Sequence, residues 1–555
     1  MRKGRDKLIT IILVVQFFML VACNNGTWAT DGSGKEGASE GNAGSECAVD
    51  GNSEIDSKKE GIDVAGKSAA SSGLSTNEAD TKAAGSSAPV KTTIQEDFPR
   101  TTLAEAGIHQ ECIDLIEEII TTDIENGFPS AQLAIVRDGK LVYEKGFGTV
   151  NAYYPDGTRK TDSAPVTTET LYDLASISKM IGVNYAIQKL VTDGELDINE
   201  KVSDYLGSEF YENTIYIDYA DGVHADLETT KKWKSELTIA HLLKHMGGFA
   251  PSPKFHNPTV NPETLEYDPE IANPLYSSVS GDESAKKATI EKICETPLMY
   301  EPGTKVLYSD VDYMILGLVV EAKTGKDLDT YLKETFAEPL GLSHITYAPL
   351  DHGFDIDQIA ATELNGNTRD GYVTFPGIRT ETIQGQVHDE TAYYCMGGMS
   401  GHAGIFSNAT NLAMLGSLMI DGTYNGQTFF SQEVIDQFTA PKSANYQNWG
   451  LGWWRQGDMQ RTKYFGTKAG PDTIGHQGWT GTLLMIDPEK KLVIAYLTNK
   501  INSPVINKEV DSNKFLGSRY TSSTLGFVPE ILYVGLDSDE DVTEELAALR
   551  AELLK

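Results

Sequence analysis

Residues 171–190 read LYDLASISKMIGVNYAIQKL and contain a serine and a lysine three positions apart, Ser176 and Lys179. Apolar residues recur through this stretch with a helical period, at Ile177, Met180, Ile181, Val183, Ala186, Ile187 and Leu190. So wide an apolar surface predicts a helix that is buried on nearly all sides. Because residues i and i+3 share one face of a helix, a helix that begins near Ser176 brings the lysine ammonium group within reach of the serine hydroxyl.

A serine beside a lysine in apolar surroundings is a candidate for an activated nucleophile. The hydroxyl is a poor nucleophile until a base or a cation lowers its effective pKa, and a neighbouring lysine can supply that. Ser284 and Lys287 repeat the spacing in the polar run GDESAKK, which has no apolar periodicity, and we interpret that pair as solvated surface. The alternative for Ser176, a helix start with an ordinary surface lysine, is disfavoured by its apolar context.

The N-terminus has the features of an export signal. Basic residues between positions 2 and 7 precede an apolar run over residues 8–22, which is short for a membrane span. The run ends in LVAC at residues 20–23, which resembles a bacterial lipobox and implies cleavage before a lipidated Cys23. The alternative is a plain secretory signal with an incidental cysteine.

Composition divides the rest of the chain. Residues 23–95 are rich in Gly, Ser, Ala and charged residues, which predicts a disordered linker after the lipidated cysteine. We expect one catalytic domain over residues 96–536 and an acidic tail over residues 537–555, with a short helix near Thr543. The net charge of −34 disfavours nucleic acid as a partner. The cysteine spacing predicts neither a disulfide framework nor a structural metal.

The chain order of the predicted elements indicates an α/β fold of the α+β type. Two hairpins are expected, one over residues 131–143 across Asp138-Gly139 and one over residues 481–497. The clearest helices cover residues 108–124, 237–245 and 311–324. We therefore predict an antiparallel sheet built from N- and C-terminal segments, flanked by helices and carrying a helical insert.

Two further stretches place polar groups at loop boundaries. In YEPGTKVLYSD, residues 300–310, Tyr308 can act as a base only if a cation such as Lys179 depresses its pKa; the alternative is a packed tyrosine with its hydroxyl in water. In IGHQGWTG, residues 474–481, Gly478 would let a substrate lie against the strand, and the next amide would point into the site. The alternative there is a plain glycine-rich turn.

Together these stretches resemble a known family. Ser176-Ile177-Ser178-Lys179, Tyr308-Ser309-Asp310 and His476-Gln477-Gly478, in that order, are similar to the three motifs of serine β-lactamases and penicillin-binding proteins, in the class C-like branch. LTIAHLLKHMGGF (237–249), GGMSGHAGIFS (397–407) and WGLGW (449–453) most resemble low-molecular-mass D-alanyl-D-alanine carboxypeptidases of that branch. The resemblance covers roughly residues 97–535.

The resemblance implies a role for each residue. Ser176 attacks an acyl carbonyl, Lys179 and Tyr308 share the proton transfers, and the amides of Ser176 and Trp479 form the oxyanion hole. Asp310 and His476 replace the commoner Asn and Lys. We expect Asp310 to accept a hydrogen bond from a substrate amide, and His476, with a reference pKa of about 6.5, to be only partly charged when it meets a substrate carboxylate. No cofactor or metal is implied, and His388-Asp389-Glu390 is interpreted as a hydrogen-bonded loop.

The expected function is that of a membrane-anchored, extracytoplasmic lipoprotein of a bacterium. It forms an acyl-enzyme and acts as a D-alanyl-D-alanine carboxypeptidase on peptidoglycan stem peptides or another D-Ala-containing or ester substrate, with β-lactams as covalent ligands. A class C-like β-lactamase and a carboxylic esterase are alternatives within the same chemistry. A penicillin-sensing or wall-binding lipoprotein with little turnover is the alternative from another class.

Overall fold

The computed structural model describes residues 98–219, 225–261 and 267–554. The predicted signal peptide, Cys23 and the linker to residue 95 lie outside these residues. Within the described ranges, no helix combines the length and the apolar composition needed to cross a bilayer.

The central element is an antiparallel sheet with the strand order β10-β11-β12-β13-β1-β2. The bounds of these strands are β1 Ser130–Arg137, β2 Lys140–Gly148, β10 Trp454–Arg455, β11 Ile474–Gly478, β12 Thr482–Asp487 and β13 Leu492–Thr498. Strands β1 and β13 pair in register from Ala131 opposite Thr498 to Arg137 opposite Leu492. The prediction of one sheet built from both ends of the chain, with two hairpins, is therefore confirmed.

The Asp138-Gly139 turn explains how the first hairpin closes. Both residues have positive φ, 50° and 69°, as a tight two-residue hairpin turn of the primed type requires. Strands β1, β12 and β13 are buried on both faces, because helices cover both sides of the sheet.

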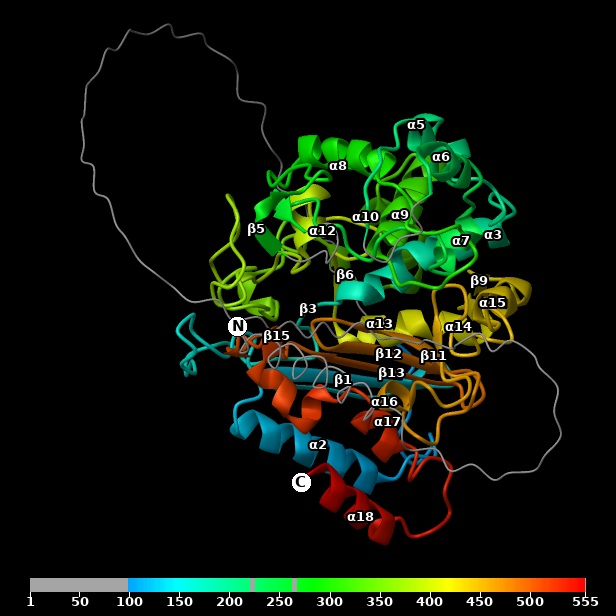
Figure 1. Cartoon of the computed structure of the whole chain (residues 1–555). Coiled ribbons are helices and arrows are strands. Elements are labelled where there is room, and N and C mark those ends of the chain that lie inside the picture. Colours follow the sequence, from blue (N-terminus) through cyan, green and yellow to red (C-terminus); the bar gives the residue numbers. More distant parts are fainter. Residues whose placement is uncertain (1–97, 220–224, 262–266, 555) are drawn as a thin grey trace, which may run out of the picture. The chain divides into compact units, whose positions relative to one another are not determined.

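One face of the sheet packs against helices from the two ends of the described chain (Figure 1). These are α2 (Gln110–Glu125), α17 (Phe527–Leu532) and α18 (Thr543–Leu553), which share a buried cluster with alternate residues of the sheet such as Leu133 and Ile494. Helix α18 begins at Thr543, whose amide donates to the Asp541 carboxylate at 2.9 Å. Leu546 of α18 is buried in the same cluster, so the acidic tail contributes to the core.

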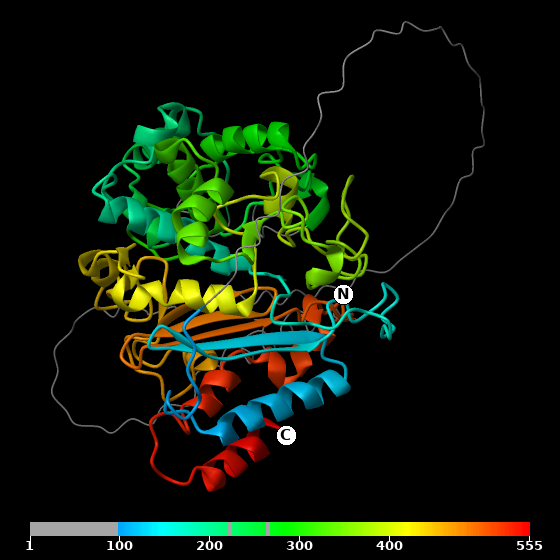
Figure 2. The same cartoon turned by 180° about the vertical axis from the view of Figure 1, so that it is seen from behind.

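The other face of the sheet packs against α13 (Ala409–Gly416), and most of the remaining helices lie beyond it (Figure 2). The central one is α9 (Asp310–Thr324), which is buried along most of its length. The other helices are α3 Tyr185–Thr192, α4 Ser203–Leu206, α5 Glu209–Glu212, α6 Leu227–Ser235, α7 Ile239–Leu243, α8 Glu283–Glu295, α10 Leu328–Leu332, α11 Glu338–Leu340, α12 Glu390–Cys395, α14 Leu418–Asp421, α15 Gln432–Thr439 and α16 Thr462–Phe465. The short helix α16 instead lies beside α17 on the first face (Figure 1), with Phe465 in the same buried cluster as α17.

Short strands and turns complete the described part. The strands are β3 Tyr172–Asp173, β4 Thr259–Val260, β5 Tyr267–Ala272, β6 Ile345–Tyr347, β7 Ile405–Ser407, β8 Thr423–Tyr424, β9 Gln427–Thr428, β14 Val505–Asn507 and β15 Asp511–Phe515. Strands β3, β7 and β6 form a small sheet just before Ser176.

Two helix predictions differ from the structure in their details. The stretch from Ser176 is not a regular α-helix: a 3₁₀ turn, η1 (Ala175–Ile177), leads into a π-helical segment, η2 (Lys179–Asn184), and α3 follows. A π-helical segment of this kind often marks a functional site. The helix expected over residues 237–245 ends earlier, at Leu243, and His245 beyond it has a positive φ of 52°.

Candidate active site

Ser176 and Lys179 are in direct contact, as their spacing predicts. The Lys179 Nζ donates to the Ser176 Oγ at 2.9 Å; the lysine side chain is fully buried, whereas Ser176 is partly exposed. Ala175, just before the serine, has a φ of 46°, which is unusual for a residue with a side chain. Its amide donates to the Asp173 carboxylate at 2.8 Å, which helps to hold this turn. The turn thus presents the serine hydroxyl to solvent against a fixed ammonium group.

Each N–H of the Lys179 ammonium group has an acceptor. Besides Ser176, the Nζ contacts the Asp310 Oδ1 at 2.9 Å and the main-chain carbonyl of His402 at 3.2 Å, and it lies 4.9 Å from the centre of the Tyr308 ring. Burial lowers the pKa of Lys179, but the Asp310 carboxylate and the Tyr308 hydroxyl outweigh this effect and raise the pKa above its usual value. Lys179 is therefore a cation in this state, and it acts on Ser176 as a hydrogen-bond donor.

Tyr308 lies beside this pair, just before α9. Its ring packs against His245, with ring centres 4.4 Å apart, and against Trp449 at 6.4 Å. Burial raises the pKa of Tyr308 and the Asp310 carboxylate adds to this, while Lys179 and hydrogen bonding to Lys179 and Ser176 act in the opposite direction. The net pKa is raised, so the depression considered for a tyrosine base is absent in this state. The side chain is a neutral phenol next to Ser176.

Asp310 differs from its expected arrangement. The sequence suggested a contact with a substrate amide, but the carboxylate forms an ion pair with Lys179 and is 24% exposed. The position of Asp310 explains the contact: its amide donates to the Pro251 carbonyl at 2.8 Å, and it is the first residue of α9. An asparagine there would leave the lysine without a counterion.

His476 is more deeply buried than its expected role required. Its Nδ1 lies 2.7 Å from the Gln477 carbonyl, which can only accept, so the Nδ1 carries the proton and the Nε2 is an unprotonated acceptor. No hydrogen bond reaches the Nε2 within the described residues. Burial, with Lys179 and Arg461 adding to it, lowers the pKa of His476 to about 3 despite the Gln477 carbonyl. The expectation of a partly charged imidazole at neutral pH is therefore wrong for this state.

The buried neutral imidazole has a consequence for acid stability. Because the unfolded histidine takes up a proton near pH 6.5 and the folded one only near pH 3, the unfolded chain binds more protons in between, and stability falls as the pH falls through that window. At pH 4.5 this single group costs about 2 kcal/mol relative to pH 7. In urea unfolding at both pH values, His476→Gln should therefore lose less stability on acidification than the unaltered protein. Equal losses would contradict the buried neutral state.

Gly478 allows two segments of the protein to approach closely. A Cβ at this position would lie 2.1 Å from the Thr482 Oγ1 and 2.3 Å from the Leu174 carbonyl oxygen. The space that the sequence assigned to a substrate is thus occupied by the chain just before Ser176. The Thr480 hydroxyl also donates to the Asp173 carbonyl at 2.8 Å. These contacts bring the turn that contains Trp479 next to the nucleophile.

A methyl group at position 478 should impair both catalysis and folding. Gly478→Ala forces β11 away from the Ser176 turn, and a misplacement of about 1 Å can cost on the order of 100-fold in rate. We expect kcat for an ester substrate to fall by about 10- to 100-fold, and the free energy of unfolding to fall by about 1–3 kcal/mol. Gly470→Ala is the matched control, since its Cβ would meet only the Glu489 carboxylate at 3.5 Å. Equal activity of the two variants would refute the close approach.

Trp479 is 39% exposed at the edge of the site. Its ring stacks on His388, with centres 4.9 Å apart, and lies 5.1 Å from the Arg369 guanidinium carbon. Arg369 in turn is paired with Glu363 and, at 2.8 Å, with Glu390. The indole of Trp479 therefore packs against His388 and Arg369, which belong to a buried network of charged residues, and part of the ring remains exposed to solvent.

Three residues that support the site were not identified as site residues from the sequence: Asp173, His402 and His245. The Asp173 carboxylate accepts the amides of Ala175 at 2.8 Å and His388 at 2.7 Å, so it ties the nucleophile turn to the loop before α12. His402 contacts the Asp389 carboxylate at 2.9 Å, and its carbonyl binds Lys179. His245, which the sequence showed only as one residue of the 237–249 stretch, packs on Tyr308. Apart from Ala175, their partners come from distant parts of the chain, so no local pattern marks these groups.

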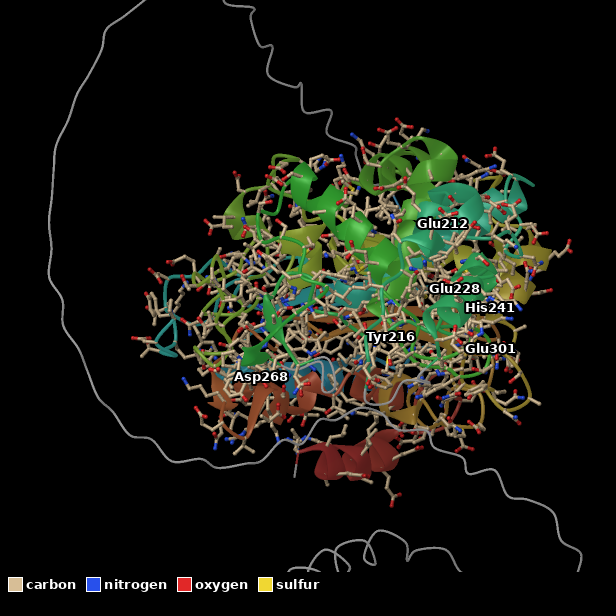
Figure 3. All side chains as sticks on the ribbon, turned by 45° about the horizontal axis from the view of Figure 1, so that its top comes forward. Glu212, Tyr216, Glu228, His241, Asp268 and Glu301 are labelled. Atoms are coloured by element: carbon tan, nitrogen blue, oxygen red, sulfur yellow. The ribbon has the colours of Figure 1, made fainter. Side chains whose placement is uncertain are left out.

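The described residues hold no group of three or more His, Cys, Asp or Glu side chains suited to a metal ion. His388, Asp389 and Glu390 instead pair with Glu363, His402 and Arg369. A pocket lies elsewhere, in the helical part around Tyr216, on the surface that also displays Glu212, Glu228 and Glu301 (Figure 3). None of its lining side chains is a serine, cysteine or lysine, so it offers no second Ser–Lys pair.

Comparison with known proteins agrees with this geometry. A family model described as Beta-lactamase matches residues 113–516. The chain is 41% identical over 434 residues to an Escherichia coli (strain K12) protein named "Putative D-alanyl-D-alanine carboxypeptidase", covering 78% of this chain and 92% of that protein. A Salmonella enteritidis protein of the same name is 39% identical over 448 residues, with 79% and 95% covered.

Among solved structures, the fold is similar to EstCE1, a hydrolase with promiscuous acyltransferase activity (TM-score 0.52, 18% identity, 77% of this chain and 99% of that chain). It is also similar to a penicillin-binding protein homologue from Caulobacter crescentus (TM-score 0.51, 19% identity, 77% and 99% covered). At these identities the two structures support the fold alone. With its matched family model, its close relatives and a Ser–Lys pair in contact, this chain belongs to the β-lactamase family of serine hydrolases.

Proposed function

We propose that this protein is a D-alanyl-D-alanine carboxypeptidase that acts on peptidoglycan stem peptides outside the cytoplasm. The observation that carries the proposal is the contact between the partly exposed hydroxyl of Ser176 and the buried ammonium group of Lys179, next to the phenol of Tyr308. The names of the relatives at about 40% identity support the choice of substrate.

In this proposal the residues divide the work of an acyl transfer. Ser176 attacks the carbonyl of the penultimate D-alanine, and Lys179 and Tyr308 handle the protons. The amides of Ser176 and Trp479 stabilise the oxyanion, an interaction whose loss typically costs about 3 kcal/mol of barrier. Terminal D-alanine leaves, and water then releases the acyl group from Ser176. β-Lactams, which carry a reactive acyl group, are expected to acylate the same serine.

A carboxylic esterase is a second candidate that one observation favours. His476, the expected partner of a substrate carboxylate, is neutral and buried, with a pKa lowered to about 3 by that burial. A neutral ester does not need a cation at this position, whereas a peptide with a free carboxylate gains from one. A class C-like β-lactamase and a penicillin-sensing or wall-binding lipoprotein are further outcomes that the same experiment separates.

The test compares covalent labelling with turnover. Residues 98–555 are incubated with a fluorescent penicillin, with a peptide ending in D-Ala-D-Ala, and with a short-chain chromogenic ester, and intact mass and product are followed together. A carboxypeptidase releases D-alanine repeatedly, a β-lactamase turns over the penicillin, and a sensor stops at a stable penicillin adduct. Turnover of the ester with no release of D-alanine would replace the carboxypeptidase proposal by the esterase one.

We also propose that the protein is a lipoprotein anchored at Cys23. The support is the LVAC sequence after a basic and apolar N-terminus. Stable anchoring requires more than one acyl chain, which a diacylglycerol at Cys23 would supply. Mass spectrometry of the mature N-terminus from the membrane fraction tests this. A soluble product with an unmodified N-terminus would refute the anchor.

A further inference from the structure

The Nζ of Lys179 lies between a hydroxyl and a carboxylate at equal distances. It is 2.9 Å from the Ser176 Oγ and 2.9 Å from the Asp310 Oδ1. The Nζ also donates to the His402 carbonyl at 3.2 Å, and the Tyr308 hydroxyl is a further hydrogen-bond partner of the ammonium group. An ammonium group has three donors and no acceptor, so all of its hydrogen-bonding capacity is used.

In this state Lys179 cannot take the proton of Ser176 unless it first gives one away. The His402 carbonyl is not basic, and Tyr308 is a neutral phenol. Because the pKa of Tyr308 is raised, the phenol keeps its proton, and the carboxylate that forms an ion pair with the Nζ is that of Asp310. Asp310 therefore holds the negative charge of this cluster, and it is the acceptor in direct contact with the lysine.

We propose that Asp310 is a catalytic residue, the terminal proton acceptor of a Ser176–Lys179–Asp310 relay. As the Ser176 Oγ bonds to the acyl carbon, its proton passes to the Lys179 Nζ, and a proton of the Nζ passes to the Asp310 Oδ1. The carbonyl π electrons move to the oxyanion, the lysine remains an ammonium group, and the aspartate becomes a carboxylic acid. On collapse the leaving group takes a proton from Lys179, which recovers one from Asp310. This inference rests on the acyl-enzyme chemistry of the proposed function.

Other ionisable groups that face the lysine are engaged elsewhere or uncharged. Asp389, at the start of α12, acts on Lys179 only through space, and its carboxylate is bound to His402 at 2.9 Å. Burial and nearby cations lower the pKa of His476 on β11 and of His245 after α7, so both are neutral. Buried Asp312 on α9 has a raised pKa and contacts His245 at 3.4 Å. None of these groups is in hydrogen-bond contact with the Lys179 Nζ.

Replacement of Asp310 by asparagine separates catalysis from substrate binding. An asparagine oxygen still accepts a hydrogen bond from a substrate amide, so a purely binding role survives Asp310→Asn. The role of proton acceptor is lost in Asp310→Asn, because a neutral amide is not basic enough to take a proton from Lys179. Lys179 must then lose its proton to solvent before it can act as the base.

The experiment uses a chromogenic ester, so its outcome does not depend on whether the protein cleaves cell-wall peptides. We expect Asp310→Asn to lower kcat at pH 7 by at least 100-fold with KM changed less than threefold. The remaining rate should rise about tenfold per pH unit between pH 7 and 9, because the fraction of neutral lysine rises in that proportion. Asp268→Asn, which removes a partly exposed carboxylate on strand β5, is the matched control and should leave both constants unchanged.

A second measurement needs no substitution. Two protons move in the relay, so the rate of acylation in mixtures of H₂O and D₂O should curve with the deuterium fraction in the unaltered protein. It should become linear in Asp310→Asn. A linear dependence in the unaltered protein would overturn the relay. So would an Asp310→Asn variant that keeps its activity and pH profile, or one that loses activity only through KM.

Discussion

Replacing Ser176 by alanine should abolish both turnover and covalent labelling by a penicillin. The Ser176 Oγ is the hydroxyl in contact with the buried Lys179 ammonium group, and removal of a covalent nucleophile typically lowers kcat by on the order of 10⁴–10⁶-fold. The loss of one partly exposed hydroxyl should change the melting temperature little. Intact mass after incubation with a fluorescent penicillin measures the labelling, and ester hydrolysis measures the turnover.

Ser284→Ala is the matched control because it removes the serine of the second Ser-x-x-Lys pair. In the structure Ser284 is an exposed residue at the start of α8, and its hydroxyl donates to the Asp282 carboxylate at 2.6 Å. We expect this variant to be labelled and to turn over at the normal rate. Labelling that persists in Ser176→Ala would mean that another residue is the nucleophile.

Lys179→Met should reduce kcat by about 10⁴-fold or more, because Ser176 loses its hydrogen-bond donor and its route for proton transfer. The variant also leaves the Asp310 carboxylate without its cation beside the raised-pKa phenol of Tyr308. Removal of one partner of a buried pair is destabilising, and since Asp310 is partly exposed we expect a loss of only about 2 kcal/mol. Stopped-flow ester hydrolysis and urea unfolding measure the two effects.

The double variant Lys179→Met/Asp310→Asn distinguishes chemistry from stability. With neither charge present, no unpaired carboxylate remains, so the free energy of unfolding should recover by at least half of the loss. Activity should not recover, because the serine still lacks its lysine. If the double variant is as unstable as Lys179→Met, the unpaired Asp310 carboxylate is not the cause of the lost stability, and this prediction is wrong.

Local patterns were sufficient for the main elements of the fold. The Asp138-Gly139 turn and the apolar runs on either side predicted the first hairpin, and the structure has it as β1 and β2. The apolar period over residues 311–324 predicted α9 to within one residue. These signals are local because a helix or strand buries one face, and the positions of its apolar residues then repeat with the period of that element. The π-helical segment at Lys179 was not predictable in this way, since packing against distant segments determines it.

The sequence by itself predicted Ser176, Lys179 and Tyr308 as candidate catalytic residues and showed the order in which they occur. Ser176 and Lys179 are three residues apart, so their contact follows from the geometry of a single turn. Only the tertiary structure decided the charge states, because these depend on burial and on groups that are distant in the chain. Asp310 lies more than a hundred residues from Lys179, yet it pairs with it at 2.9 Å. His476 is neutral because β11 buries it beside that same cation, and burial in a medium of low polarity disfavours a second positive charge.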